Sequence, residues 1–298
     1  MLQQLVIIGA GEIGKALEKV LRKQNLAISL WDKDPSKVRS QKPLKEIVPD
    51  ADFLFLCIPS WALRNALNNL LPFLNKKTLI ISLAKGIEEN TKKTTDELLQ
   101  ELLPRGQNFA LLFGPMLAEE LTKGMVGIGV VASKNQKAFH QLAKIFTHTN
   151  LYLEYSKDIR GVALSGVLKN IYAIALGIAD GLRWGGNAKG WLVARAINEM
   201  AKIAQMLGGK KETALGTAGL GDLIATGFSP YSRNRRIGYE LVRNGRSHLQ
   251  SEGFISLSPL GKRLYKNKEK FLLLKALEDI IIRNKKCKII FENLRVHG

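Results

Sequence analysis

The sequence predicts an α/β protein with a doubly wound, mostly parallel sheet in its first half and an all-α second half. Six short apolar runs in the first half alternate with amphipathic segments. Strands that are apolar along their whole length bury both faces, so helices must cover both sides of the sheet. After about residue 150 the alternation stops and helical periodicity replaces it, which predicts a second, helical domain.

Each expected element follows from this pattern. Strands are expected at Leu5–Ile8, Ala27–Trp31, Phe53–Ile58, Thr78–Ser82, Phe109–Phe113 and Gly127–Ala132, with a last strand-like piece at 151–155. Stretches such as 14–23, 62–71 and 94–103 have the spacing of helices. In the second half, helical periodicity covers Ile159–Leu207, Arg235–Arg243 and Leu272–Arg283. We therefore expect domains at 1–155 and 156–298, with the boundary near Tyr155.

Composition and cysteine usage indicate a globular protein without a disulfide framework. Hydrophobic residues make up 46% of the 298 residues, which is enough for a sizeable core. Cys57 and Cys287 cannot form a disulfide framework, and Cys57 in the run FLFLCI is expected to be a buried thiol. Cysteine and histidine show no metal-ligand spacing, so no metal is expected. The chain opens directly into an apolar strand without a secretory leader, and a cytoplasmic location is the expectation.

The net charge of +19 needs an explanation. Basic residues are spread along the chain, and no aromatic RNA-binding signature lies among them, so a specific nucleic-acid partner is not expected. We interpret the charge as a lysine-rich solvated surface, and focusing of phosphate substrates or weak contact with anionic membranes stays open. The longest apolar stretch, 161–181, contains Lys169 and Asn170, which favours a buried helix over a membrane span.

A glycine motif predicts a dinucleotide site. The sequence Gly9-Ala10-Gly11-Glu12-Ile13-Gly14 follows a strand and opens a helix, as in a Rossmann domain. Gly9 permits the tight turn, Gly11 admits the pyrophosphate, and Gly14 allows close packing of helix on strand. The helix N-terminus then faces the phosphates with its N–H groups.

Two further positions bear on the same site. Asp32 ends the second strand about 20 residues later, where an acidic residue can accept from a ribose 2′-OH. This favours NAD, whereas Lys33 can attract the 2′-phosphate of NADP and keeps that cofactor open. Pro59 ends the third strand at the same edge of the sheet, and Ser60 can cap the next helix.

Three segments contain polar residues that their apolar surroundings do not explain: 84–87, 168–170 and 218–238. Lys169 is the sharpest case, because a lysine inside an apolar helix loses hydration and its charged form is disfavoured. Such a lysine needs a partner or a function, and proton transfer is a common one. The alternative is a lysine whose stem lies along the helix surface while its charge reaches water.

With these segments in place, the sequence resembles the NAD(P)-dependent glycerol-3-phosphate dehydrogenase family. The resemblance covers most of the chain and rests on GAGEIGKAL, CIPSWALRNAL, SLAKGIE, FGPMLAEEL, the LKN of the long apolar helix, GLGDL, SRNRR and the later SEG. It implies interconversion of glycerol 3-phosphate and dihydroxyacetone phosphate, a role in glycerophospholipid synthesis and a homodimer.

The resemblance also implies residue roles. Lys169 would accept the proton of the substrate hydroxyl, Lys85 would contact substrate near the nicotinamide, and Asp222 would lie beside the reacting centre. Substrate contacts would be Lys85, Gly114, Asn170, Asp222, Thr226, Ser232, Arg233 and Asn234. Cofactor contacts, including those from the glycine turn and strand ends, would be Gly9, Gly11, Glu12, Ile13, Gly14, Asp32, Lys33, Pro59, Lys85, Ala118, Arg233 and Glu252.

The sequence departs from the family pattern in three places, and two alternative functions stay open. Met116 stands where a serine or threonine is usual, Glu12-Ile13 replaces the common serine–aromatic pair, and the stretch 34–50 is shortened. One alternative is a related dehydrogenase of ketopantoate or a small hydroxy acid. The other is a non-enzymatic NAD-binding protein. The run SRNRR after GDL suits a phosphate better than a lone carboxylate, because arginine matches phosphate with a planar fork.

Overall fold

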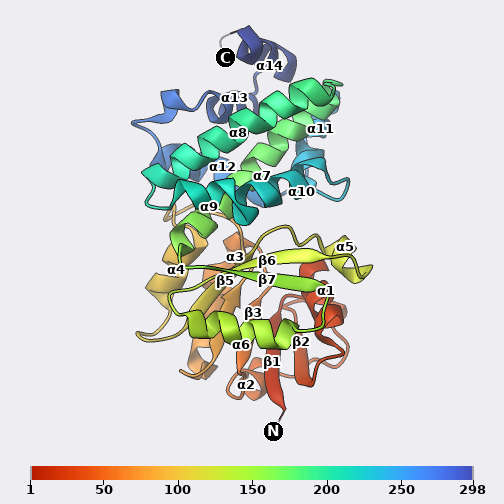
Figure 1. Cartoon of the computed structure of the whole chain (residues 1–298), viewed down its shortest axis with the longest axis vertical. Coiled ribbons are helices and arrows are strands. Elements are labelled where there is room, and N and C mark those ends of the chain that lie inside the picture. Colours follow the sequence, from red (N-terminus) through yellow and green to blue (C-terminus); the bar gives the residue numbers. More distant parts are fainter. Residues whose placement is uncertain (1, 297–298) are drawn as a thin grey trace. The chain divides into compact units, whose positions relative to one another are not determined.

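The protein is described here by a computed structural model that covers residues 2–296, shown in Figure 1. The chain divides into two compact units. The first contains the residues up to Lys85 together with Thr95–Ala163. The second contains Gly86–Thr94 and the residues from Leu164 onward.

Within residues 2–296, seven strands of the first unit form one sheet in the order β2-β1-β3-β4-β5-β6-β7. The strands are β1 (Gln3–Ile8), β2 (Leu26–Trp31), β3 (Phe53–Leu56), β4 (Leu79–Ser82), β5 (Phe109–Phe113), β6 (Gly127–Ala132) and β7 (Leu151–Ser156). Neighbours pair in parallel except β5 and β6, which are antiparallel. The prediction of a mostly parallel sheet is confirmed.

Helices accompany the strands of this unit, and the longer ones bury one apolar face. The helices are α1 (Glu12–Leu21), α2 (Leu44–Ile47), α3 (Ser60–Leu70), α4 (Thr95–Leu102), α5 (Ala118–Thr122) and α6 (Gln136–Phe146). Helix α1, for example, buries Ala16, Leu17, Val20 and Leu21, a spacing that matches the helical repeat. The core of the unit includes Cys57, so its predicted burial is confirmed, and burial raises the pKa of this thiol far above its ordinary value.

The second unit is helical, as predicted. It contains α7 (Ile159–Gly181), α8 (Gly186–Met206), α9 (Lys211–Leu215), α10 (Asp222–Phe228), α11 (Arg233–Asn244), α12 (Glu252–Arg263), α13 (Leu272–Ile281) and α14 (Cys287–Val296), coloured green to blue in Figure 1. The periodicity expected over Ile159–Leu207 is split into two helices, because the chain turns at 182–185, where Arg183 has a φ of 58°. Helix α7 is long and apolar enough to cross a membrane, yet its apolar stretch is wholly buried inside the structure.

The division of the chain differs from a single boundary at Tyr155. The first turn of α7 belongs to the first unit, where Arg160 forms ion pairs with Asp96 and Glu97 of α4 at 3.2 and 3.1 Å. Residues 86–94 belong to the second unit, because Ile87 packs in its core and donates its backbone N–H to Ser256 Oγ at 3.0 Å. The last two residues of the predicted domain 156–298 lie outside the described residues.

Glu199 of α8 links this helix to α7 and α13 within the second unit. Its carboxylate accepts hydrogen bonds from the Tyr172 hydroxyl at 2.7 Å and from the backbone N–H groups of Leu273 and Leu274 at 2.8 and 3.0 Å. Helix α13 has no side-chain cap of its own, so Glu199 satisfies its first N–H groups. Burial raises the pKa of Glu199, and the three hydrogen bonds oppose that rise.

The raised pKa predicts a pH-dependent effect of Glu199→Gln. A carboxyl group with a raised pKa binds more protons in the folded state than in the unfolded state. Its contribution to stability is therefore complete below the ordinary glutamate pKa and falls as the pH rises through the folded value. We expect the stability advantage of the wild type over Glu199→Gln to shrink as the pH is raised above the ordinary glutamate pKa, as measured by urea unfolding. An advantage that grows with pH would contradict this assignment.

Candidate functional site

The glycine turn lies at the carboxyl edge of the sheet. The register pairs Ile8 with both Trp31 and Leu56, so β1, β2 and β3 end at the same level. Gly9 has a φ of +106°, and a Cβ there would lie 2.4 Å from the Cys57 carbonyl oxygen. At Gly14 a Cβ would lie 1.9 Å from the Gly9 carbonyl oxygen. Both positions therefore require glycine.

The turn fits the pyrophosphate of a dinucleotide. A Cβ added at Gly11 would meet no atom within 4 Å, so open space lies beside this backbone. Helix α1 begins at Glu12, and its N-cap residue, Gly11, makes no side-chain cap. A helix start without a side-chain cap in front of open space is suited to bind an anion. Ile13 is half-buried and packs against the core, so of the pair Glu12-Ile13 only Glu12 is exposed.

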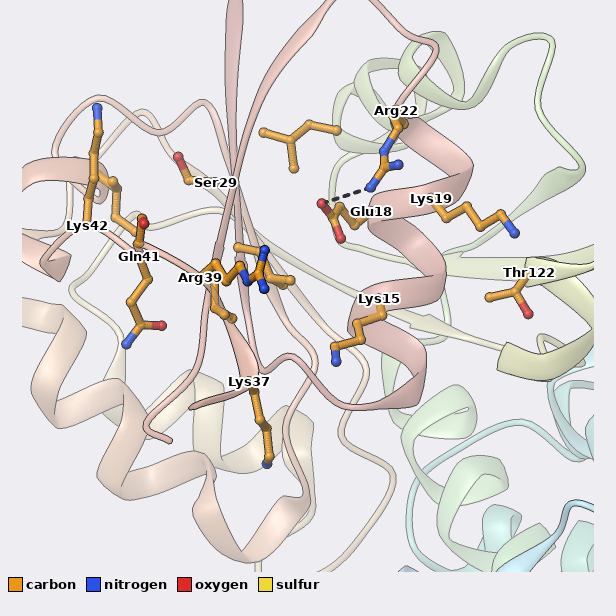
Figure 2. A pocket seen from close by; sticks show the side chains of 15 residues that line it. Lys15, Glu18, Lys19, Arg22, Ser29, Lys37, Arg39, Gln41, Lys42 and Thr122 are labelled. Carbon is orange, nitrogen blue, oxygen red and sulfur yellow. Dashed lines mark ion pairs between the residues drawn. The ribbon is translucent and has the colours of Figure 1, made fainter. Parts of the chain in front are cut away.

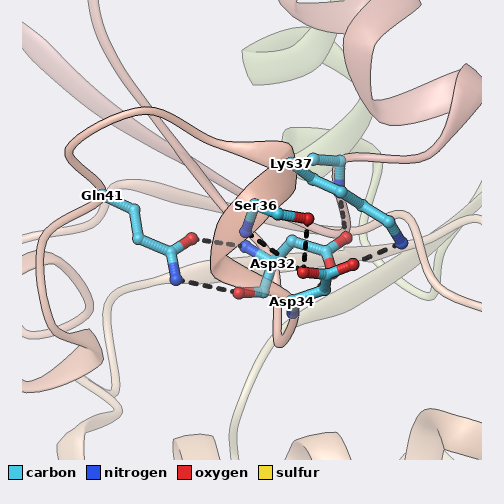
Figure 3. Close-up of polar contacts among 6 residues, drawn as sticks. Asp32, Asp34, Ser36, Lys37 and Gln41 are labelled. Carbon is cyan, nitrogen blue, oxygen red and sulfur yellow. Dashed lines mark hydrogen bonds and ion pairs between the residues drawn. The ribbon is translucent and has the colours of Figure 1, made fainter.

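Asp32 follows β2 and has its carboxylate turned inward. Its side chain is buried, with Oδ2 accepting from the Ala10 N–H at 2.8 Å and Oδ1 from the Asp34 N–H at 3.0 Å. Lys37 Nζ lies 3.6 Å from Oδ1, and the Gln41 amide both accepts from and donates to the Asp32 backbone (Figure 3). Asp32 therefore braces the glycine turn, while Lys33 beside it is exposed.

The next strand ends carry the remaining predicted cofactor positions. Pro59 precedes the first residue of α3, and the prediction that Ser60 caps this helix is wrong. Ser60 is instead the first helical residue, and it is buried. Lys85, just after β4, donates to the Gly114 carbonyl oxygen at 3.2 Å, and its Nζ lies 5.4 Å from the centre of the Phe113 ring.

The loop after β5 explains one departure from the family pattern. Gly114 has a φ of +129°, and a Cβ there would lie 2.5 Å from the Ile128 carbonyl oxygen. Met116 packs into the apolar core of the first unit, so its side chain takes a structural role. Ala118 begins the short helix α5.

Lys169, Asp222 and Thr226 form a buried polar cluster in the second unit. Lys169 Nζ lies 3.1 Å from Asp222 Oδ1 and donates to Thr226 Oγ1 at 2.8 Å. The Thr226 hydroxyl donates in turn to Asp222 Oδ1 at 3.1 Å. The exposed fractions of the three residues are 6%, 1% and 5%. The surface-lysine alternative is therefore excluded, because both stem and amine of Lys169 are buried.

The chain geometry before α10 places this cluster. Residues Thr217–Gly221 form a single π-helical turn that leads into α10 at Asp222. Thr226 follows Asp222 by four residues, so both side chains lie on one face of α10 and are directed at Lys169 of α7. Insertions of this kind into helices occur frequently at functional sites.

A second polar cluster lies one residue further along α7. Asn234 donates from Nδ2 to Asn170 Oδ1 at 2.9 Å, and its own Oδ1 accepts from the Gly253 N–H at 3.0 Å. The Ser232 hydroxyl caps α11 by accepting from the Arg235 N–H at 3.2 Å. Arg233 is exposed at the first residue of that helix, and Glu252 is the first residue of α12.

Glycines bring these helices together, and sequence reasoning missed them. A Cβ at Gly177 of α7 would lie 1.9 Å from the Arg235 carbonyl oxygen, and one at Gly238 of α11 would lie 2.0 Å from the Ile174 carbonyl oxygen. A Cβ at Gly253 would lie 2.3 Å from the Asn170 carbonyl oxygen. Glycines inside otherwise good helical segments were the available signal, because they cost stability unless packing requires them.

The structure therefore gathers the sequence-predicted residues into two groups. Gly9, Gly11, Gly14, Asp32 and Pro59 lie at the carboxyl edge of the sheet, in the first unit. The second unit contains the two hydrogen-bonded clusters, one of Lys169, Asp222 and Thr226 and the other of Asn170 and Asn234. Among residues 2–296, no three His, Cys, Asp or Glu side chains are grouped as metal ligands.

Comparisons with known proteins agree with this arrangement. The N- and C-terminal parts of the NAD-dependent glycerol-3-phosphate dehydrogenase family match residues 33–139 and 158–292. Glycerol-3-phosphate dehydrogenase [NAD(P)+] of Clostridium tetani is 33% identical and covers 94% of this chain and 87% of its own length. The crystal structure of glycerol-3-phosphate dehydrogenase from Coxiella burnetii is 26% identical, with a TM-score of 0.89 over 100% of this chain and 99% of that one.

A more distant comparison bears on one alternative. Ketopantoate reductase from Staphylococcus aureus is 13% identical over 94% of this chain and 98% of its own, with a TM-score of 0.58. This likeness concerns the fold alone. The family matches and the higher TM-score both favour the glycerol-3-phosphate dehydrogenases over the ketopantoate alternative.

Proposed function

The chain belongs to the NAD-dependent glycerol-3-phosphate dehydrogenase family, and we propose that it interconverts glycerol 3-phosphate and dihydroxyacetone phosphate with NAD or NADP. The observation that carries this proposal is the buried Lys169–Asp222–Thr226 cluster. Burying a lysine is costly unless it is paired. Lys169 is paired with Asp222, and the reaction of the family requires a group that transfers a proton. When bound at the glycine turn, the dinucleotide supplies or accepts the hydride.

Lys169 is the group that moves the proton. In reduction of the ketone, the Lys169 ammonium gives a proton to the developing alkoxide oxygen and becomes a neutral amine, which is reprotonated from solvent. In oxidation of the alcohol, the neutral amine accepts the hydroxyl proton. Asp222 and Thr226 hold Nζ in one position, which limits the reorganisation needed during the reaction.

The other predicted residues bind and orient in this proposal. Lys85 stabilises negative charge on the substrate oxygen, with Gly114 and Ala118 in the loop beside it. Asn170, Ser232 and Asn234 orient the substrate, and Glu252 contacts the cofactor together with Arg233. Support comes from Asn170 and Asn234, which fix each other and the start of α12 by hydrogen bonds.

Arg233→Ala tests the phosphate site. A guanidinium forms charge-assisted, bidentate hydrogen bonds with phosphate, and each such bond contributes about 1.5–3 kcal/mol. We expect KM for dihydroxyacetone phosphate to rise at least about tenfold and KM for the cofactor to rise less. Arg236→Ala is the matched control, since Arg236 is an exposed arginine of the same helix that pairs with Glu240. Equal rises in both KM values for Arg233→Ala would count against phosphate binding by this residue.

The activity itself is tested by absorbance at the nicotinamide band. Purified protein should oxidise NADH or NADPH when dihydroxyacetone phosphate is added and should not do so with ketopantoate. Turnover with ketopantoate alone would favour the related-dehydrogenase alternative. No turnover with either substrate, together with binding to acidic vesicles or DNA that persists at physiological salt and weakens as salt is added, would favour the non-enzymatic alternative that the +19 charge leaves open.

The biological setting completes the proposal. Glycerol 3-phosphate made by this reaction would feed glycerophospholipid synthesis. We propose a cytoplasmic homodimer, in keeping with the free cysteines, both of which are buried. Sedimentation of the purified protein would test the dimer.

A further inference from the structure

A pocket of about 640 Å³ lies beside α1, the outer strand β2 and residues 37–42, entirely within the first unit (Figure 2). Its lining is strongly basic. The six cationic side chains that line it are Lys15, Lys19, Arg22, Lys37, Arg39 and Lys42. Glu18 is the one carboxylate in this lining, and it pairs with Arg22 at 3.5 Å. The pocket therefore carries a net charge that favours an anion.

The pocket shares Lys37 with the surroundings of Asp32, the position at which a Rossmann domain contacts the ribose 2′-OH. Asp32 directly follows β2, the place where a Rossmann domain meets the adenosine ribose. A free carboxylate there binds the 2′-OH of NAD and repels the 2′-phosphate of NADP. Here the carboxylate is 6% exposed, and its oxygens accept from the N–H groups of Ala10 and Asp34. Lys37, which also lines the basic pocket, lies 3.6 Å from it and offsets its charge.

We propose that the basic pocket receives the 2′-phosphate of NADP(H), and that Lys37 and Arg39 make the protein prefer NADP(H) over NAD(H). The proposal rests on the dehydrogenase function proposed above and reverses the lean toward NAD drawn from Asp32. Figure 2 shows Lys15 on the α1 side of the pocket, across from Lys37 and Arg39 on the loop side. A phosphomonoester brings two negative charges and three acceptor oxygens, which matches such a set of donors.

The shortened segment 34–50 gives these residues their position. Asp34 accepts from the Ser36 N–H and hydroxyl at 3.1 and 2.7 Å, and a short turn follows at Pro35–Lys37. The Gln41 side chain then holds the segment against β2 through the Asp32 backbone, at 2.9 Å in both directions. Lys37 and Arg39 lie between these two anchors. Their backbone is therefore placed before any ligand arrives, which lowers the entropic cost of binding.

Calorimetric titration with adenosine 2′,5′-bisphosphate and 5′-AMP tests the proposal without catalysis. These probes differ only in the 2′-phosphate. We expect the wild type to bind the bisphosphate at least about tenfold more tightly, and Lys37→Ala/Arg39→Ala to lose most of that ratio. Lys45→Ala is the matched control, since Lys45 is an exposed lysine of α2 outside the pocket and should leave the ratio unchanged.

Three outcomes would overturn the proposal: equal binding of the two probes by the wild type, an unchanged ratio in the double variant, or a loss confined to Lys33→Ala. The KM ratio of NADPH to NADH with dihydroxyacetone phosphate should shift in the same direction as the probe ratio. If that reaction is absent while the probes still discriminate, the proposed function fails and the phosphate site stands.

Discussion

Replacing Lys169 by alanine is expected to lower turnover at least about a hundredfold, the lower end of what removal of a general acid or base costs. The reason is that Asp222 and Thr226 hold the Lys169 amine in the buried cluster of the second unit, and alanine removes that amine. The measurement is kcat for NAD(P)H oxidation at saturating dihydroxyacetone phosphate. Lys202→Ala, an exposed lysine of α8, is the matched control and should retain wild-type turnover.

Stability must be measured beside turnover in this experiment. Removing Lys169 leaves the buried Asp222 carboxylate without its ion-pair partner, and such a loss costs about 3–5 kcal/mol. The double variant Lys169→Ala/Asp222→Asn removes that charge and should recover part of the stability without recovering activity. A folded Lys169→Ala protein with near-wild-type kcat would exclude Lys169 from proton transfer.

Gly177→Ala is expected to destabilise the second unit by about 3 kcal/mol or more, the upper range for overpacking. The added Cβ would lie 1.9 Å from the Arg235 carbonyl oxygen, so α7 and α11 would have to separate. Because Asn170 and Asn234 bond across the same two helices, their separation would also disturb the site. Urea unfolding measures the loss of stability, and KM for dihydroxyacetone phosphate measures the disturbance.

Gly190→Ala provides the control for that substitution. Gly190 is exposed in α8, and a Cβ there would meet no atom within 4 Å. Alanine at such a position should raise stability by about 0.5–1 kcal/mol, because it lowers the entropy of the unfolded chain and favours the helix. If both variants shifted stability in the same direction, close packing of α7 against α11 would not be the cause.

Local sequence patterns were enough to predict the strands and the glycine turn of the first unit. Continuous apolar runs and the Gly9–Gly14 spacing predicted the strands, the glycine turn and its helix, and each of these depends on neighbouring residues. The boundary at Tyr155 was less well predicted. The exchange of residues 86–94 into the second unit depends on Ile87 and Ser256, which lie far apart in the chain.

Asp32 shows most clearly what the sequence could not predict. Its place at a strand end indicated a ribose contact, yet its carboxylate binds the glycine turn and Lys37. No pattern near Asp32 reports where a lysine five residues later will direct its amine. Such a contact depends on the course of the shortened segment and on Gln41, which anchors it.

The amino-acid order alone was sufficient to indicate the family, to predict the α/β and helical halves and to single out Lys169 as an unusual lysine within an apolar helix. Local periodicity and residue type carry that information along a single stretch of chain. Folding in three dimensions was needed to pair Lys169 with Asp222, to bring Asn170 to Asn234 and to surround the pocket beside β2 with cations. Those contacts join residues up to 64 positions apart. They form only when the helices pack together and exclude water.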